Sequence, residues 1–176
     1  MKFGQCGSSA LLLAAVIAGC RESGTSQSAP AAAPPAPQYP TRAQPKLSTK
    51  KLYLGAEELV AELALTGEQE MTGMMFRTNI LENEAMLFVF RGPSQQAFWM
   101  KNTIVPLSIG FIDPDGTLLE VSDLQPLNTN AVSSESLNIQ YVLETKQGWF
   151  ERHHIRPGAL IKTDAGSLRQ TFFGQK

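Results

Sequence analysis

Cysteine is scarce in this sequence, and none follows residue 20: the two cysteines are Cys6 and Cys20. A region without thiols cannot form disulfides, use a cysteine nucleophile or bind a metal through thiolates. The sequence also lacks a Gly-x-Ser-x-Gly motif, a phosphate-binding glycine loop and a His-Glu-x-x-His helix. The most familiar hydrolase, nucleotide-binding and metalloprotease signatures are therefore excluded.

The C-terminal part of the chain has little basic charge. Residues 51–176 carry ten basic and fifteen acidic side chains, a net charge of minus five, whereas residues 21–50 carry four basic and one acidic. An acidic domain is a poor match for the phosphate backbone of nucleic acid. We therefore expect no nucleic-acid partner.

The first twenty residues have the pattern of an export signal. Lys2 precedes an apolar run at 10–18, which is too short to span a bilayer, and residues 17–20 read Ile-Ala-Gly-Cys. This ending resembles the bacterial lipoprotein signal. The resemblance implies a signal peptide over 1–19, cleavage before Cys20, and acyl chains such as palmitate on Cys20 that anchor the protein to a membrane. The alternative is an ordinary cleaved signal in which the cysteine is incidental.

The same resemblance predicts where the protein resides. Lipoproteins of this kind face the periplasm, and Arg21 in place of Asp after the cysteine favours the outer membrane. The rest of the 20–50 segment is rich in Ala, Pro and Ser, most densely at 29–37. Such a composition predicts a disordered linker that follows the lipidated cysteine, although a proline-rich docking site is the other interpretation.

Residues 51–176 have the length of one globular domain. Short apolar runs at 52–54, 59–65, 85–90, 97–100, 107–112, 117–124, 141–144 and 160–162 predict strands, and a Thr66-x-x-Gln69 capping box predicts a short helix to about residue 74. Residues 148–153 could add one or two helical turns. The sequence therefore predicts a mainly β fold, a compact antiparallel β-sandwich or partly open barrel with one or two short helices.

Successive blocks of this domain resemble the bacterial and archaeal family catalogued as domain of unknown function 192. The blocks are Thr-Gly-Met-Met-Phe-Arg (72–77), Ala-Met-Leu-Phe-Val-Phe (85–90), Phe-Trp-Met-Lys-Asn-Thr (98–103) with Val-Pro-Leu (105–107), Phe-Ile-Asp (111–113), Asp-Gly (115–116), Tyr-Val-Leu-Glu (141–144) and Ile-Arg-Pro-Gly (155–158). The resemblance implies a compact, mostly β domain that is often exported, and it implies no reaction.

This chain departs from the family pattern at two positions. The family usually has Asp where Ser108 and Ala159 stand here. If those acidic groups form a functional pair in the family, the activity is lost or changed in this chain.

The residues that we predict to bind a ligand are Arg77, Trp99, Lys101 and Asn102. Basic groups and an amide at the loop edges of a β scaffold suit an anion, a carboxylate or a sugar hydroxyl, with Trp99 as a flat wall. Strand alternation places Trp99 and Lys101 on one face. Small residues in the next strand, Ser108 and Gly110, could leave a hollow beside Trp99 or let another segment approach closely.

A structural network is the alternative for the same residues. In that interpretation Arg77 or Lys101 pairs with Glu144 or Asp113, Asn102 caps its turn and Trp99 lies in the core.

Five of the six methionines lie in or upstream of the central block, and thioethers are ligands for Cu(I). They are Met71, Met74, Met75, Met86 and Met100. Methionines beside Phe and Leu are more often core residues. We therefore expect no cofactor and no metal, and keep Cu(I) binding as an alternative.

Three classes of function remain open. The first is a non-enzymatic domain that binds a small anionic or sugar ligand, and the second is a structural module that contacts another envelope protein. The third is a hydrolase that uses two carboxylates. The candidate carboxylates are Glu82, Glu84, Asp113, Asp115 and Glu144. A binding domain predicts a concave, partly open pocket, and an enzyme predicts two titratable groups in one cleft.

Overall fold

A computed structural model describes residues 39–174 of the chain. The predicted signal peptide (1–19), Cys20 and the linker up to residue 38 lie outside the described residues. Across the part that is described, no helix combines the length and the apolar character needed to cross a membrane.

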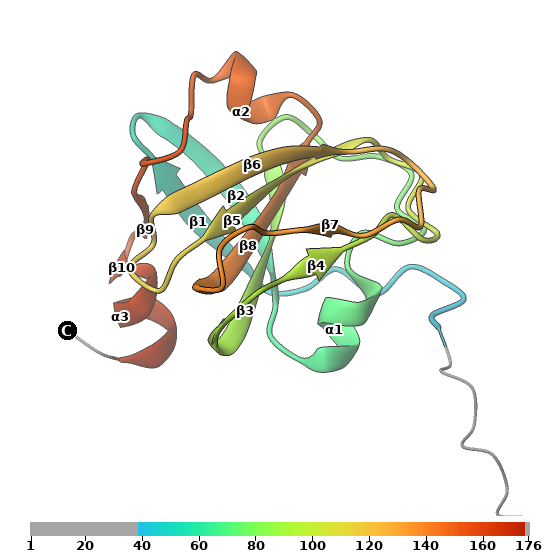
Figure 1. The fold of residues 1–176 in the computed structure, drawn as a ribbon, viewed down its shortest axis with the longest axis horizontal. Helices are drawn as coiled ribbons and strands as arrows, with labels where there is room; N and C mark the ends of the chain where they lie inside the picture. The colour runs from blue at the N-terminus through green and yellow to red at the C-terminus, as the bar shows by residue number, and fades with distance from the viewer. Residues whose placement is uncertain (1–38, 175–176) are drawn as a thin grey trace, which may run out of the picture. The chain divides into compact units, whose positions relative to one another are not determined.

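The domain is built on an open, mixed sheet of eight strands (Figure 1). Their order is β10, β9, β1, β2, β3, β8, β5, β6, and a separate two-stranded sheet joins β4 to β7. The strands are β1 (Thr49–Leu54), β2 (Glu57–Ala64), β3 (Glu84–Ser94), β4 (Ala97–Phe98), β5 (Leu107–Ile112), β6 (Leu118–Leu124), β7 (Val132–Ser133), β8 (Ile139–Lys146), β9 (Ile161–Thr163) and β10 (Gly166–Ser167). The predicted mainly β class is confirmed.

One strand pair differs from the antiparallel pattern that we predicted. β2 and β3 pair in parallel, whereas the other strand pairs are antiparallel. A parallel pair needs a crossover connection, and the chain between β2 and β3 contains helix α1 (Gly67–Thr72). The predicted capping box begins this helix: the Thr66 hydroxyl accepts the Gln69 N–H, and the Gln69 side chain accepts the Thr66 N–H.

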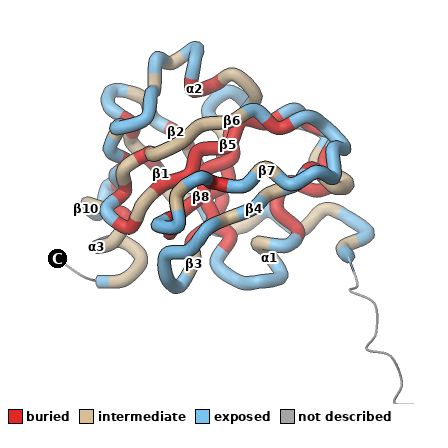
Figure 2. Tube along the Cα trace, in the orientation of Figure 1, coloured by how far each residue is buried: buried red, intermediate tan, exposed pale blue. Residues whose placement is uncertain are grey.

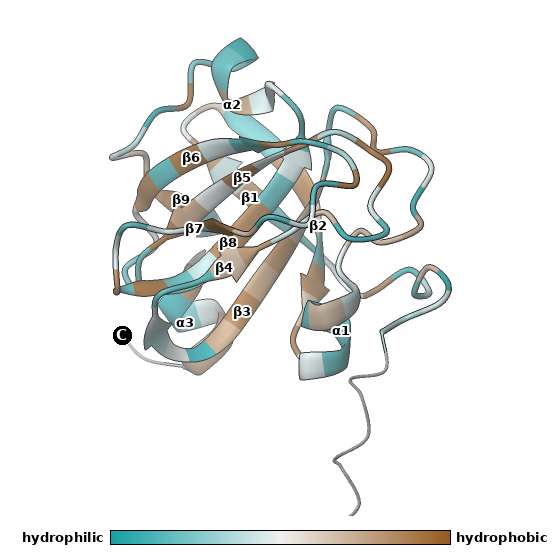
Figure 3. Ribbon diagram, turned by 45° about the vertical axis from the view of Figure 1, so that its right-hand side comes forward, coloured by the Kyte–Doolittle hydropathy of each residue, from teal (hydrophilic) through white to brown (hydrophobic). Residues whose placement is uncertain are grey.

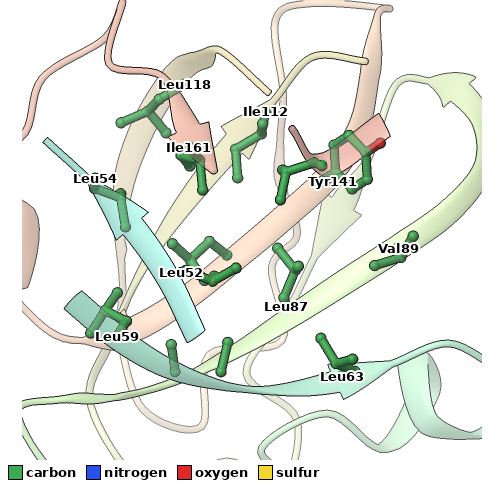
Figure 4. Close-up of a cluster of buried hydrophobic side chains, with 14 of the residues drawn as sticks. Leu52, Leu54, Leu59, Leu63, Leu87, Val89, Ile112, Leu118, Tyr141 and Ile161 are labelled. Atoms are coloured by element: carbon green, nitrogen blue, oxygen red, sulfur yellow. The ribbon is translucent and has the colours of Figure 1, made fainter. Parts of the chain in front are cut away.

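Both faces of the central strands are buried. Along β3, Leu87 belongs to one hydrophobic cluster, shown in Figure 4, while Met86 and Phe88 belong to a second cluster. Figure 2 shows buried residues along β5 and β8, and Figure 3 shows that β3 is hydrophobic along most of its length. Burial on two faces explains why the sequence reads 85–90 as an unbroken apolar run instead of an alternating one.

The Asp-Pro-Asp-Gly sequence at 113–116 predicts a turn, and a turn joins β5 to β6 there. Asp113 Oδ1 accepts the N–H groups of Asp115 and Thr117, at 2.9 and 2.8 Å. Gly116 has a φ of 90°, a backbone conformation that glycine adopts without strain. The pairing of β5 with β6 follows directly from this turn.

The segment at 39–48, which the composition assigned to the linker, contacts the domain. The Gln44 side-chain amide donates to the carbonyls of Gln69 and Gly73, at 3.3 and 2.9 Å. Leu47 N–H donates to Glu62, at 2.7 Å. These bonds hold the segment across the C-terminal end of α1.

Two further helices complete the fold. Helix α2 (Trp149–Arg152) occupies the region where one or two helical turns were predicted. Helix α3 (Leu168–Phe173) was not predicted, although a Ser167-x-x-Gln170 capping box marks its start.

Candidate functional site

The most unusual buried group of the domain is the carboxyl of Glu144. It lies in β8, between Met86 of β3 and Ile109 of β5 in the strand registers, and is 4% exposed. Its Oε2 has no hydrogen-bond partner among the described residues. Burial raises the pKa of Glu144 to about 8, because its apolar neighbours disfavour the charged form. The side chain is therefore a neutral carboxylic acid at pH 7.

Glu144 lines a cavity of about 210 Å³ on the face of the second hydrophobic cluster. Segments that are far apart in the sequence form its walls: the end of α1 and the turn after it, β3, β4 and the start of the 99–106 connection. The lining residues are Glu70, Met71, Thr72, Gly73, Met74, Met75, Phe88, Phe90, Gln96, Ala97, Phe98, Trp99, Thr103 and Glu144. The volume is below the roughly 300–1,000 Å³ of sites for drug-sized ligands, so the cavity suits a small molecule.

The cavity carries acidic groups and, among the described residues, no basic group. Glu70 lines it together with Glu144, and burial also raises the pKa of Glu70, an effect that the charge of Arg91 partly opposes. The remaining lining groups are apolar, aromatic or uncharged. The two carboxyl groups can pair with a cation once they lose their protons, whereas no lining side chain could pair with an anion, so the site suits a cation better than an anion.

Two of the predicted site residues, Trp99 and Lys101, meet at an aromatic cluster. Trp99 is partly exposed and lines the cavity. The Tyr39 ring centroid lies 5.6 Å from that of Trp99. The Lys101 Nζ lies 3.2 Å from the Tyr39 centroid and 5.3 Å from the Trp99 centroid, so its ammonium is held by cation–π contacts. We call Tyr39, Trp99 and Lys101 the aromatic cluster.

Asn102 does not line the cavity; it shapes the chain beside it. Its φ of 57° is left-handed, and its backbone carbonyl accepts the Phe76 N–H, at 2.8 Å. On the other side of this segment, Met100 N–H donates to Asn128 O and Leu127 N–H donates to Thr103 O. The loop from 125 to 138, for which the polar sequence predicts no helix or strand, contains β7, and these two hydrogen bonds connect it to the 99–103 stretch.

Arg77, the fourth predicted residue, is separate from the other three. Its guanidinium donates to both oxygens of Glu62, at 3.1 and 2.9 Å, and both side chains are largely buried. The network interpretation proposed an ion pair of Arg77 with Glu144 or Asp113. Neither pair forms, and Glu62 is the ion-pair partner of Arg77 instead. Arg77 thus forms a structural ion pair with Glu62 and does not line the cavity.

The methionines lie in the cavity lining, in the core, or in both. Met71, Met74 and Met75 line the cavity, and Met74, Met86 and Met100 belong to the second hydrophobic cluster. No group of three or more His, Cys, Asp or Glu side chains among residues 39–174 could hold a metal ion. A metal at this site would depend on the three thioethers and a carboxyl.

The positions at which this chain departs from the family pattern lie outside the cavity lining. The Ser108 hydroxyl donates to Asp123, at 2.5 Å, and accepts the Gly148 N–H, at 2.8 Å. Gly110 leaves no hollow beside Trp99: a Cβ there would lie 2.8 Å from Leu118 Cδ1 and 2.9 Å from Phe150 Cζ. Of the two readings of these small residues, the close approach of another segment is confirmed.

The comparisons with known proteins agree with this architecture. The family model DUF192, described as an uncharacterized ACR, matches residues 51–163. The chain belongs to the DUF192 family. A search of the curated proteins finds no match.

Two solved structures resemble this DUF192 chain, each with 28% sequence identity. One is a protein from Sinorhizobium meliloti 1021 whose description proposes a transcription regulator; the match has a TM-score of 0.65 and covers 68% of this chain and 97% of that one. The other is a protein of unknown function from Novosphingobium aromaticivorans DSM 12444, with a TM-score of 0.59 and coverage of 74% and 94%.

Sequence reasoning named Glu144 only as one of several carboxylates and did not place it in the site. A signal was present, because Glu144 closes the apolar run Tyr141-Val142-Leu143 in a strand that is buried on both faces. An acidic residue at such a position has to be paired or neutral. Glu70 and Tyr39 had no comparable signal, because the fold alone brings them to the cavity and the aromatic cluster.

Proposed function

We propose that this DUF192 domain binds a small organic cation, an amine in its ammonium form, in the Glu144 cavity. The observation that carries the proposal is the unpartnered, buried Oε2 of Glu144 in the wall of a partly open cavity. A buried polar atom without a partner is costly, and a ligand that donates a hydrogen bond and a positive charge removes that cost.

The rest of the lining supports the same ligand class. Glu70 adds a second carboxyl, and Trp99 offers an aromatic surface, which attracts ammonium groups. The Lys101 ammonium already lies against the rings of Tyr39 and Trp99. The proposal keeps Trp99 from the sequence prediction and reverses the charge that we expected of the ligand, because neither Arg77 nor Lys101 lines the cavity.

A thermal-shift comparison of the full chain tests this proposal. The probes are propylammonium, the neutral 1-propanol, propionate and glucose, with Ag(I) as a stand-in for Cu(I). We expect propylammonium alone to raise Tm, by an amount equivalent to about 2.7 kcal/mol at one hundred times Kd. Glu144→Gln should abolish the shift, and Glu151→Gln, which alters an exposed carboxyl on α2, should preserve it.

Each other outcome of that comparison points to a different ligand. A shift with glucose or propionate would replace the cation proposal with the sugar or anion ligand expected from the sequence. A shift with Ag(I) that Met71→Leu and Met75→Leu abolish would assign the cavity to a soft metal. No shift with any probe would contradict small-ligand binding and favour an envelope protein as the partner.

Acid–base catalysis is a second candidate, because Glu70 and Glu144 line one cavity and both have raised pKa values. Two carboxyls with perturbed pKa values are a common feature of active sites. If the cavity is catalytic, NMR of a simple amide of such an amine should show its hydrolysis, in which water adds to the carbonyl carbon, the C–N bond breaks, and a carboxylate and the free amine appear. Loss of that turnover in both Glu70→Gln and Glu144→Gln, with binding retained in Glu70→Gln, would establish the enzyme.

The place of the protein in the cell is a proposal from the sequence. We infer that Cys20 carries the lipid anchor, that residues 21–38 act as a spacer, and that the domain faces the periplasm, on the outer membrane. Cys20→Ser should release the protein from the membrane fraction, and retention there would contradict the proposal. The acidic charge of residues 51–176 gives no reason to carry over the transcription role in the description of the Sinorhizobium protein.

A further inference from the structure

A second pocket lies between β1, β9 and the loop after α2. Its charged lining residues are basic, whereas those of the Glu144 cavity are acidic. The volume of this second pocket is about 380 Å³. It is lined by Tyr53, Gly55, His154, Ile155, Arg156, Ala159, Leu160 and Lys162. No acidic residue is among them. We call this the basic pocket.

The basic residues of this pocket are unusual for the domain because they lack carboxylate partners. Of the fourteen Lys, Arg and His residues in 39–174, eight form ion pairs with carboxylates of the described residues. The remaining six are Arg42, Arg91, Lys101, His154, Arg156 and Lys162. Three of these six line the basic pocket. These three residues are exposed, so their side chains are accessible to a ligand in the pocket and no carboxylate of the described residues competes for them.

The fold positions these groups from two separate segments. Tyr53 of β1 lies directly opposite Lys162 of β9 in the strand register. His154 and Arg156 come from the loop after α2, where His154 has a left-handed φ of 55° and its N–H donates to Glu151 O. The pocket thus places an aromatic ring and a lysine from the sheet beside a guanidinium and an imidazole from the loop.

We propose that the basic pocket binds a phosphate-bearing ligand. An arginine fork and a lysine ammonium are the side chains that proteins use most for phosphate oxygens. The Tyr53 ring and the half-exposed Leu160 offer apolar surface to the group that carries the phosphate. A soluble phosphate monoester and the headgroup of an anionic lipid share this chemistry. The site is independent of the Glu144 cavity, because no residue lines both.

NMR titration of the full chain with glycerol 1-phosphate, at constant ionic strength, tests the proposal. We expect saturable shifts of the backbone amide signals of His154 and Lys162, and at least a tenfold loss of affinity in Lys162→Ala and in Ala159→Asp, which adds a carboxylate to the pocket. Arg91→Ala is the matched control, since Arg91 is also unpaired but lines no pocket described above. It should leave the affinity unchanged.

Vesicles distinguish the two sources of phosphate. If glycerol 1-phosphate gives no shifts but phosphatidylglycerol vesicles bind the wild-type chain and not Lys162→Ala or Ala159→Asp, the ligand is a lipid headgroup. All vesicle measurements use chains that also carry Cys20→Ser, so that no acyl chain contributes, and phosphatidylcholine vesicles should then not bind in either case. The proposal is overturned if neither probe binds, or if Arg91→Ala weakens binding as much as Lys162→Ala does. Neither result depends on whether amines bind at Glu144.

Discussion

Arg77 holds Glu62 with two hydrogen bonds, at 3.1 and 2.9 Å, on the largely buried side of β2. Glu62 also accepts the N–H of Leu47, so one carboxylate joins the turn after α1 to the segment that precedes β1. Neither residue of the pair lines the Glu144 cavity.

Loss of Arg77 should destabilise the domain and leave ligand binding in place. Arg77→Ala leaves the Glu62 carboxylate buried without its cationic partner, and we expect a loss of about 3 kcal/mol in the free energy of unfolding. Urea denaturation measures this change. The double variant Arg77→Ala with Glu62→Gln should recover part of the loss, because no unpaired charge remains. A single variant as stable as the wild type would show that the pair is not a structural requirement.

The neutral Glu144 predicts how stability depends on pH. The folded-state pKa is about 8 and the ordinary value is 4.5, so between these values the folded protein retains a proton that the unfolded chain releases. The free energy of unfolding should therefore be highest below pH 4.5, as far as this group is concerned, and should fall by up to about 1.4 kcal/mol per pH unit between 4.5 and 8. No further loss is expected above pH 8.

Glu144→Gln is the control for this pH dependence, because the amide has nearly the same shape and cannot ionise. Unfolding curves from pH 5 to 9 should show a flatter profile in the variant, with a relative gain in stability at the alkaline end. Parallel profiles for the two proteins would mean that Glu144 does not titrate in this range.

Gly110 should tolerate no side chain. The Cβ of Gly110→Ala would meet Leu118 Cδ1 and Phe150 Cζ at less than 3 Å, and both side chains are packed in the first hydrophobic cluster. Overpacking of a close-packed core costs about 1–3 kcal/mol. Thermal unfolding should therefore show a lower Tm for Gly110→Ala, whereas Gly92→Ala, where a Cβ meets nothing within 4 Å, should match the wild type. Equal Tm values for the two variants would contradict the packing described for β5.

Tryptophan fluorescence should report on the aromatic cluster. The sequence has two tryptophans: Trp149 is 1% exposed and Trp99 is 36% exposed. Because acrylamide reaches the exposed indole more easily, the quenching of fluorescence comes mainly from Trp99. Tyr39→Ala removes the ring that covers Trp99, and we expect stronger quenching. Propylammonium at saturation should weaken quenching in the wild type. Unchanged quenching in Tyr39→Ala would show that the Tyr39 ring does not shield Trp99 from solvent.

Local sequence signals were sufficient for much of the fold. The Thr66 capping box and the turn at 113–116 form as predicted because their side chains bond within a few residues of themselves. The parallel pairing of β2 with β3 depends instead on contacts between distant segments, and no local pattern encodes it. The apolar run at 85–90 indicated burial but not which strands would cover its two faces.

The site was harder to predict than the fold, for a related reason. Trp99 and Lys101 lie near one another as expected, because only one residue separates them in the chain; strand alternation is not the reason, since β4 ends at Phe98. The ion-pair partners expected for Arg77 were Glu144 or Asp113, but its partner is Glu62. Glu62 is fifteen residues away in the sequence, and the crossover between β2 and β3 brings the two side chains together. The pKa of Glu144 is raised because apolar residues such as Met86 and Ile109 on the two neighbouring strands bury its carboxyl. The sequence alone does not show which strands are its neighbours.

The most direct test of the central claim is isothermal titration calorimetry of the full chain with propylammonium at pH 7, in two buffers of different ionisation enthalpy. If the ammonium group pairs with Glu144, binding converts a neutral carboxyl with a pKa of about 8 into a carboxylate. We predict the release of close to one proton per ligand and an affinity that rises about tenfold from pH 6 to pH 7. Both effects should be absent in Glu144→Gln. Binding without proton release, or equal binding by Glu144→Gln, would show that Glu144 is not the residue that receives the ligand.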